Sequence, residues 1–580
     1  MKIIIDKKNN YLEIRANSVE TTNLIERRFS IYVNENYRWM TAVKEKRWDG
    51  KIPFMTDGRM KIGLLHELLT FCKNVGIDYT INFKAKNKIS HEKLKAWIET
   101  LNLPKNRQLR DYQYKIFYDL LVYNRISAQS EMGSGKSLII YLILRFMLKH
   151  DIRTMLIVPN IDLLYQMRDD FISYGWKDTN KYLQIIGDTH RKKEFDKPII
   201  ISTWQSLNAK RLKLYNQILG KRKKELTQQL VKDKLPELEH NNIFQAINFS
   251  ISLIKKKITV DLKKFKINSI KYLFKKNKDI FPEWKEINNE IDQFEINIQK
   301  DFDTLQCVIG DESDTSTGEA LSHVLEKCSK TQFRLGLTGT MPIKEWSNWY
   351  TIIANFGKYK QYNTYRDLAD KGLLSDITIK LNYFNYNVNI KKDYHENVDK
   401  SNYREALYYM SKLDCRNDEI VSKVHSLKNK NILLMFQFKE GEGHNYYKFF
   451  KDKFKRKLFY IDGDISNRKN LIKQMKAYKG NYICLGSMKT MSRGINIPNL
   501  TNIFLLSSLR NRESLFQLIG RLSRLFGNNK AVFEDIIDNL VMEDEGGNLL
   551  TNLSIKHHFD RIEVYKERKY KMKKVETNIK

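Results

Sequence analysis

Short apolar runs that alternate with amphipathic segments are the main pattern in the central part of the chain. Runs such as Thr154 to Val158, Ile199 to Ser202 and Leu305 to Ile309 have the length of buried β-strands. Between the first two runs, apolar residues such as Leu163 and Met167 are spaced as on one face of a helix. Strands that alternate with helices predict a parallel sheet with both faces covered.

The same alternation returns in the second half of the chain. Four further strands are predicted there, at Ile432 to Phe436, Leu458 to Ile461, Tyr482 to Leu485 and Asn502 to Leu506. We therefore expect an α/β protein with two parallel-sheet domains, residues 105–361 and 362–540, followed by a basic C-terminal segment, residues 541–580.

Residues 1–104 predict a small α/β accessory domain, with a strand at Tyr11 to Ile14 and a helix from about Leu64 to Val75. Basic and aromatic residues are interleaved in its middle, between Arg27 and Lys51. Basic side chains bind phosphates and exposed rings stack on bases, so we consider Arg47 and Trp48 candidate DNA contacts. The alternative is that most of these rings form the core of the domain.

A Lys-rich segment interrupts the first parallel-sheet domain at about residues 209–300. Its apolar residues keep a helical spacing, at Ile251, Ile254, Ile258 and Leu262. This pattern predicts a basic helical insertion. Three roles stay open for it: an arm that contacts DNA phosphates, a docking surface for an acidic protein partner, or a solvated helical hairpin without a dedicated task.

The composition favours a polyanionic partner. The chain of 580 residues has 102 basic and 68 acidic residues, a formal net charge of +34. A basic surface that serves only solubility, or a Lys- and Asn-rich genome, is the alternative. The five cysteines are scattered and form no Cys-x-x-Cys pair, which argues against a zinc site or a disulfide framework. No signal sequence or long apolar stretch is seen, so we expect an intracellular protein that does not enter a membrane.

The stretch Ser130 to Ser137, Ser-Glu-Met-Gly-Ser-Gly-Lys-Ser, has the pattern of a phosphate-binding loop between a strand and a helix. Gly133, Ser134 and Gly135 allow backbone N–H groups to face a polyphosphate. Lys136 would reach the β- and γ-phosphates, and Ser137 would contact Mg²⁺. Ser130 stands where the usual pattern has its first glycine, and a glycine-rich turn without a nucleotide is the alternative.

Two carboxylates follow the strand predicted at Leu305 to Ile309. Adjacent acidic residues at the carboxyl edge of a strand, close to a phosphate loop, suit a Mg²⁺–nucleotide site. Asp311 would hold the Mg²⁺ shell, and Glu312 would accept a proton from the attacking water.

A helical stretch near residue 520 places Gln517, Arg521 and Arg524 three or four residues apart, on one face. Two arginines on one face would clamp the γ-phosphate from across a cleft. The alternative is a solvated basic helix face.

Taken together and in their order, these segments resemble the motifs of the superfamily 2 helicases. The matching segments are Leu109-Arg-Asp-Tyr-Gln113, Ser130 to Ser137, Ile157-Val-Pro-Asn160, Ser202-Thr-Trp-Gln205, Asp311-Glu-Ser-Asp314, Leu337-Thr-Gly-Thr340, Ser492 to Pro498 and Gln517 to Arg524. The resemblance implies two RecA-like motor domains that face each other across an ATP site, and a DNA-stimulated ATPase.

The resemblance also implies roles for individual residues. Gln113 would read adenine, and Gly494 with Asn496 would lie beside DNA and ribose. Thr338 and Thr340, with Asp314, would couple hydrolysis to DNA, which Thr203 and Arg493 would contact. Asp314 departs from the pattern of the family that the chain otherwise resembles, because an Asp at the fourth position of the Asp311-Glu-Ser-Asp314 motif is typical of the DEAD-box RNA helicases.

Outside these motifs, segments such as Arg47 to Ile52 and Phe559 to Ile562 resemble the branch-migration helicases of bacteriophage recombination. That resemblance implies unwinding, branch migration or annealing of forked or branched DNA, in recombination, repair or replication, within a host cell. Three alternatives stay open: a DEAD-box-like RNA helicase, the motor subunit of a restriction-type system, and a DNA-binding switch that does not hydrolyse ATP.

Overall fold

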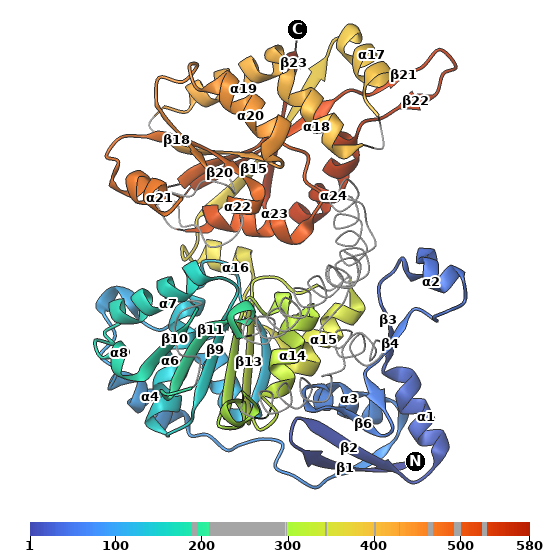
Figure 1. Cartoon of the computed structure of the whole chain (residues 1–580), viewed down its shortest axis with the longest axis vertical. Helices are drawn as coiled ribbons and strands as arrows, with labels where there is room; N and C mark the ends of the chain where they lie inside the picture. Colours follow the sequence, from blue (N-terminus) through green and yellow to red (C-terminus); the bar gives the residue numbers. More distant parts are fainter. Residues whose placement is uncertain are drawn as a thin grey trace, which may run out of the picture.

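Three sheets organise the chain in the computed structural model (Figure 1). The structure describes residues 1–187, 195–207, 296, 298–342, 345–399, 402–428, 430–461, 468–491, 500–524 and 530–579. The insertion expected at about 209–300 lies almost entirely outside these residues, and so does the segment that contains Arg493, Gly494 and Asn496.

The first motor sheet has seven parallel strands in the order β10-β11-β9-β12-β13-β8-β14. They are β8 (Arg125–Gln129), β9 (Thr154–Val158), β10 (Leu183–Ile186), β11 (Ile199–Thr203), β12 (Cys307–Asp311), β13 (Phe333–Thr338) and β14 (Lys358–Gln361). Every residue of β8, β9, β11, β12 and β13 is buried. Continuous apolar runs form such strands because helices cover both faces of a parallel sheet.

Helices connect these strands. They include α6 (Lys136–Lys149), α7 (Ile161–Ser173), α14 (Glu319–Lys327) and α15 (Trp346–Phe356), and α5 (Asp111–Tyr123) leads into β8. Asn160 caps α7, since its side chain accepts a hydrogen bond from the N–H of Leu163.

The second motor sheet also has seven parallel strands, in the order β17-β18-β16-β19-β20-β15-β23. They are β15 (Asp376–Tyr386), β16 (Asn431–Phe436), β17 (Lys457–Ile461), β18 (Tyr482–Ser487), β19 (Leu500–Leu505), β20 (Lys530–Asn539) and β23 (Lys571–Ile579). Two parallel-sheet domains are therefore confirmed. Residues 541–580, which the sequence set apart, contribute α24 (Leu553–Glu567) and the edge strand β23 to this sheet.

The N-terminal unit has a mixed five-stranded sheet in the order β5-β6-β2-β1-β7. Its strands are β1 (Lys2–Lys8), β2 (Tyr11–Ala16), β5 (Met55–Thr56), β6 (Arg59–Lys61) and β7 (Asp78–Ile81), and its helices include α1 (Val19–Arg28) and α3 (Leu65–Val75). β3 (Ser30–Tyr32) pairs with β4 (Lys51–Pro53) and leads to the short helix α2 (Thr41–Lys44). Figure 1 shows this hairpin extending away from the five-stranded sheet.

A helix that precedes the boundary expected at residue 104 packs in the core of the first motor domain. α4 (His91–Glu99) places Leu94 and Trp97 in the core of the first motor domain, where the Trp97 ring contacts Phe117 and Phe146. An amphipathic helix shows in its sequence which face is buried, but not which domain buries it.

Candidate nucleotide site

A cavity of about 570 Å³ lies between the two motor sheets. The phosphate loop and the ends of β12 and α23 (Arg512–Ile519) bring the expected residues to it. Those that line the cavity are Gly133, Gly135, Lys136, Ser137, Asp311, Glu312, Gln517, Arg521 and Arg524. The structure thus gathers residues that are almost 400 positions apart in the chain.

The phosphate loop follows β8 and ends where α6 begins. Gly133 and Gly135 have φ angles of +76° and +82°. A Cβ atom on Gly135 would lie 2.6 Å from Nε2 of Gln113. Both positions therefore favour glycine strongly, because residues with a side chain rarely adopt this left-handed backbone. Ser134, between them, is fully buried.

Ser130 does not need the backbone freedom of the glycine that it replaces, since it is absent from the residues with positive φ. Its hydroxyl donates to Oγ of Ser134 at 2.8 Å and accepts from Nδ2 of Asn363 at 2.9 Å. Asn363 also accepts a hydrogen bond from the N–H of Glu131 at 2.9 Å. Ser130 therefore fixes the loop through its side chain. Its partner Asn363 belongs to the segment that connects the first motor sheet with the second along the chain.

Gln113 is buried behind the loop. Its Nε2 donates to the carbonyl oxygens of Ser134 and Gly135 at 2.9 and 3.3 Å, and its Oε1 accepts from the N–H of Arg110 at 2.9 Å. In this structure the amide holds the shape of the loop, and its role in reading adenine stays a prediction.

The acidic pair at the end of β12 faces Lys136. Nζ of Lys136 lies 3.7 Å from Oε1 of Glu312. Burial, with the Glu312 carboxylate beside it, raises the pKa of Asp311 to about 7. Oδ1 of Asp311 and Oε2 of Glu312 are buried without a hydrogen-bond partner in the described part of the chain. Glu312 also has a φ of +51°, which is rare for a residue with a side chain.

The two arginines reach the cavity from the second motor domain. Burial, with the neighbouring Arg524, lowers the pKa of Arg521 to about 10. Burial also lowers the pKa of Arg524, and the carboxylate of Asp170 opposes that shift. Two crowded cations at the wall of a cavity favour an anion between them and the loop.

Two sequence families match this chain. The profile described as "Type III restriction enzyme, res subunit" matches residues 106–343, and that described as "Helicase conserved C-terminal domain" matches residues 412–526. Each match contains one wall of the cavity. The chain belongs to the superfamily 2 helicases. It is therefore an enzyme with ATP-dependent helicase domains, and such domains imply the use of ATP.

Individual relatives include a helicase that aligns over almost the whole chain. The chain is 22% identical to the ATP-dependent DNA helicase uvsW of Enterobacteria phage T4 over 582 residues, which cover 97% of each protein. Solved structures that align with it include T4 UvsW (20% identity, all of both chains, TM-score 0.42) and Dbp5 of S. cerevisiae bound to RNA and ADP BeF3 (14% identity, 84% of this chain and 94% of that one, TM-score 0.47).

The helicase segment Leu337 to Thr340 lies directly behind the acidic pair. The hydroxyl of Thr338 is 3.2 Å from Oδ1 of Asp314, and it donates to the carbonyl oxygen of Thr340 at 2.7 Å. The carbonyl oxygen of Thr338 also accepts from the N–H of Ser130 at 2.9 Å. Thr338 thus contacts the other two residues expected to couple hydrolysis to nucleic acid, and it also contacts the phosphate loop.

Of the residues expected to contact DNA, Arg493 lies outside the described residues, Thr203 ends β11 of the first motor sheet, and Arg47 and Trp48 belong to the N-terminal unit. Thr203 is buried, and its Oγ1 accepts from the N–H of Ser206 at 3.2 Å. Arg47 is exposed and pairs with Glu45, whereas Trp48 donates its Nε1 hydrogen to the carbonyl oxygen of Lys51 at 2.9 Å.

Sequence reasoning also missed residues of the helicase site. Tyr174 is one of them, because its hydroxyl lies 2.7 Å from Oγ of Ser137, the group expected to contact Mg²⁺. Asp170 lines the same cavity, and burial raises its pKa. Both residues lie near the C-terminal end of α7, and no local pattern connects them with a loop more than thirty residues earlier.

Proposed function

We propose that the chain is a DNA-stimulated, ATP-dependent helicase or translocase that acts on forked or branched DNA. The observation that carries this proposal is the similarity to the T4 DNA helicase over 97% of both chains, which includes the N-terminal unit as well as the two motor domains. Under this proposal the protein works inside a host cell, in recombination, repair or replication.

The residues at the cavity fit a Mg²⁺–ATP complex. The unpartnered oxygens of Asp311 and Glu312, and the loop that excludes side chains at Gly133 and Gly135, are what a cation and a polyphosphate require. Ser137 and Asp311 would hold the ion, whose positive charge would neutralise phosphate oxygens.

The chain's own groups would then perform the hydrolysis. Lys136 would leave Glu312 and contact the β- and γ-phosphates, which frees the Glu312 carboxylate to accept a proton from water. Arg521 and Arg524 would stabilise the charge that develops on the γ-phosphate, with Gln517 beside them. Gly494 and Asn496, outside the described residues, keep their proposed place beside ribose.

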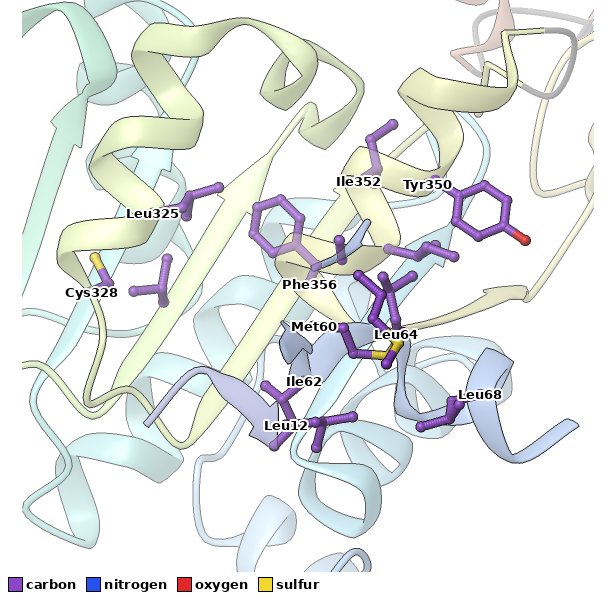
Figure 2. Close-up of a cluster of buried hydrophobic side chains, with 14 of the residues drawn as sticks. Leu12, Met60, Ile62, Leu64, Leu68, Leu325, Cys328, Tyr350, Ile352 and Phe356 are labelled. Atoms are coloured by element: carbon purple, nitrogen blue, oxygen red, sulfur yellow. The ribbon is translucent and has the colours of Figure 1, made fainter. Parts of the chain in front are cut away.

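The N-terminal unit is fixed to the first motor domain, which supports a role for it in substrate recognition. One continuous apolar core contains Leu64 and Met60 of the unit and Ile352 and Phe356 of α15 (Figure 2). Lys61 adds a hydrogen bond of 2.9 Å to Oδ1 of Asn355. A unit held in this way would move with the first motor domain and keep its hairpin at a fixed place on the substrate.

The hairpin presents one largely exposed indole. Trp39 is 74% exposed, and Nζ of Lys44 lies 5.0 Å from its ring centre. Exposed rings with cations beside them stack on unpaired bases while the cations bind phosphate. We therefore add Trp39 to Arg47 and Trp48 as the residues of the hairpin that would meet DNA at a junction.

ATP hydrolysis measured with single-stranded, duplex and forked DNA and with RNA tests this proposal. Forked DNA should stimulate turnover most, and Trp39→Ala should reduce that preference while single strands still stimulate. Tyr79→Ala removes an exposed ring from β7 of the same unit and is the matched control. Stimulation by RNA above that by any DNA would refute the proposal in favour of an RNA helicase, the alternative suggested by Asp314.

A motor subunit of a restriction-type system is a second candidate, favoured by the family description that matches residues 106–343. The same assay distinguishes this candidate, because such a motor should respond to long duplexes more than to forks.

The insertion at about 209–300 stays a proposed DNA arm or docking surface for a protein partner. Replacing it by a Gly/Ser linker should flatten the salt dependence of DNA binding by roughly 0.9 per lost phosphate contact if it is an arm.

A further inference from the structure

Arg568 brings a buried positive charge into the boundary between the two motor domains. It follows α24 directly, and its side chain is 8% exposed. Burial lowers its pKa. Buried arginines are normally found where several partners hold the guanidinium group. The partners of Arg568 come from both motor domains.

Three contacts surround the guanidinium group. Nη1 forms an ion pair with Oε1 of Glu131 in the phosphate loop. Nη2 donates to the carbonyl oxygen of Gly339 at 3.1 Å, and the guanidinium carbon lies 4.3 Å from the ring centre of Phe516. Glu131 and Gly339 belong to the first motor domain, whereas Phe516 belongs to α23 of the second.

These partners are adjacent to the residues that handle the nucleotide. Phe516 directly precedes Gln517, in the stretch that continues to Arg521 and Arg524. Gly339 lies between the two threonines expected to couple hydrolysis to DNA. Glu131 is anchored in turn, because its N–H donates to Asn363. One side chain therefore links the phosphate loop, the coupling segment and the arginine-bearing helix.

The surrounding boundary is closely packed, so small displacements at Arg568 reach the site. Oγ of Ser523 donates to the carbonyl oxygen of Met132 at 3.2 Å, and a Cβ atom on Gly520 would lie 2.4 Å from Sδ of Met132. The arginine-bearing stretch thus rests directly on the phosphate loop, and Arg568 lies at the edge of that contact.

We propose that Arg568 is a positioning residue for ATP hydrolysis. Its ion pair with Glu131, its bond to Gly339 and its stacking on Phe516 hold the arginine-bearing helix against the phosphate loop when the cleft is closed. The inference rests on the ATPase activity of the helicase domains and does not depend on which nucleic acid the protein prefers.

The test compares Arg568→Gln with Lys566→Gln, which removes one positive charge from the exposed side of the same helix end. Any nucleic acid that stimulates the wild-type protein is suitable. Arg568→Gln should lower stimulated kcat at least about tenfold, while the Kd of a fluorescent ATP analogue changes by less than about threefold, because the loop and Lys136 remain. Lys566→Gln should behave as the wild type.

A conservative and a double variant separate positioning from a merely structural role. Arg568→Lys keeps the charge but not the planar fork, so its kcat should lie between those of the wild type and Arg568→Gln. The double variant Arg568→Gln with Glu131→Gln should be no slower than the slower single variant, because the two residues act together. If Arg568→Gln fails to fold, Arg568→Lys tests the proposal in its place, because its kcat should fall while its Kd for the ATP analogue stays nearly unchanged.

Two results would overturn the proposal. The first is that the stimulated kcat of Arg568→Gln lies within about twofold of the kcat of the Lys566→Gln control. If only Arg568→Lys folds, the same comparison is made with that variant. The other is a double variant whose loss equals the product of the two single losses, since independent residues multiply their effects on a rate.

Discussion

Gly63 allows the N-terminal unit to lie directly against the backbone of α15 in the first motor domain, and one methyl group there tests how the two are joined. A Cβ atom on Gly63 would lie 2.2 Å from the carbonyl oxygen of Ile353 and 2.4 Å from that of Ala354. Both oxygens are backbone atoms of α15, so neither can rotate away. In Gly63→Ala the unit and the helix must separate by at least about 0.8 Å to reach even the shortest contacts that side-chain carbons make.

The cost follows from the apolar core shared across this boundary. A gap of that size forfeits about a quarter to a half of the dispersion energy of each contact that it opens. Overpacking usually costs about 1–3 kcal/mol, and rigid backbone places Gly63→Ala at the upper end, at about 3 kcal/mol. For domains of this size we expect the melting temperature to fall by about 5 °C or more.

Thermal unfolding followed by intrinsic fluorescence measures this effect, and Gly76→Ala is the control within the same unit. Gly76 has a φ of +70° with nothing within 4 Å of an added Cβ atom, so its variant bears only backbone strain, about 1–2 kcal/mol. Gly63→Ala should also lose preference for forked DNA while single strands still stimulate it. A melting temperature no lower than that of Gly76→Ala would refute the tight docking that we infer.

Three further predictions concern the cleft and the second motor domain. Lys136→Ala should weaken ATP binding, whereas Glu312→Gln should bind ATP nearly as the wild type but lose turnover by at least roughly 10²-fold. Equilibrium binding and steady-state ATPase measurements check the two results together. Equal losses of ATP affinity in the two variants would contradict these roles. Arg521→Ala and Arg524→Ala should each lower the rate of nucleic-acid-stimulated hydrolysis by about 10³-fold or more, without lowering the melting temperature. Near-normal stimulated turnover in either variant would show that its arginine takes no part in the mechanism. Burial lowers the pKa of His558 from 6.5 to about 4, so its contribution to stability is complete above pH 6.5 and is lost as the pH falls towards 4. Chemical denaturation should show that the wild type loses roughly 2 kcal/mol more than His558→Asn between pH 7.5 and pH 5, and equal losses would show that the histidine protonates freely.

The parts of the fold that the sequence predicted are those with a local cause. The strand at Thr154 to Val158 was located to the residue and that at Ile432 to Phe436 to within one residue at its start, since strands buried in a parallel sheet are mostly apolar. Gly133 and Gly135 were recognised because left-handed backbone in a phosphate loop requires glycine. Such signals depend only on neighbouring residues, so one sequence is enough to identify them.

The parts that the sequence did not predict depend on contacts between distant segments. The DNA contact of Trp48 stays a prediction, but the sequence did not show that Trp39 would be the exposed ring of the hairpin. Exposure depends on how the chain folds back on itself, and both tryptophans have basic neighbours in sequence. Tyr174 and Arg568 were missed for the same reason, because nothing in their own surroundings in the sequence connects them with the phosphate loop.

No membrane-spanning candidate occurs in the described ranges, where every helix is too short or too polar to cross a bilayer.

The phosphate loop is tied both to the connection between the two motor domains and to the second of them. Ser130 is held by Asn363, which lies between β14 and β15 and so belongs to the connection between the two motor domains. Glu131 is held by that same asparagine and by Arg568, and Met132 accepts a hydrogen bond from the arginine-bearing stretch. Three consecutive residues of the loop are therefore tied to the connection or to the opposite domain. The ties of Glu131 to Arg568 and of Met132 to Ser523 cross to the second motor domain, so a separation of the two domains would break them and release the loop. This arrangement explains why a serine serves at position 130, because glycine would form the turn without binding the connection.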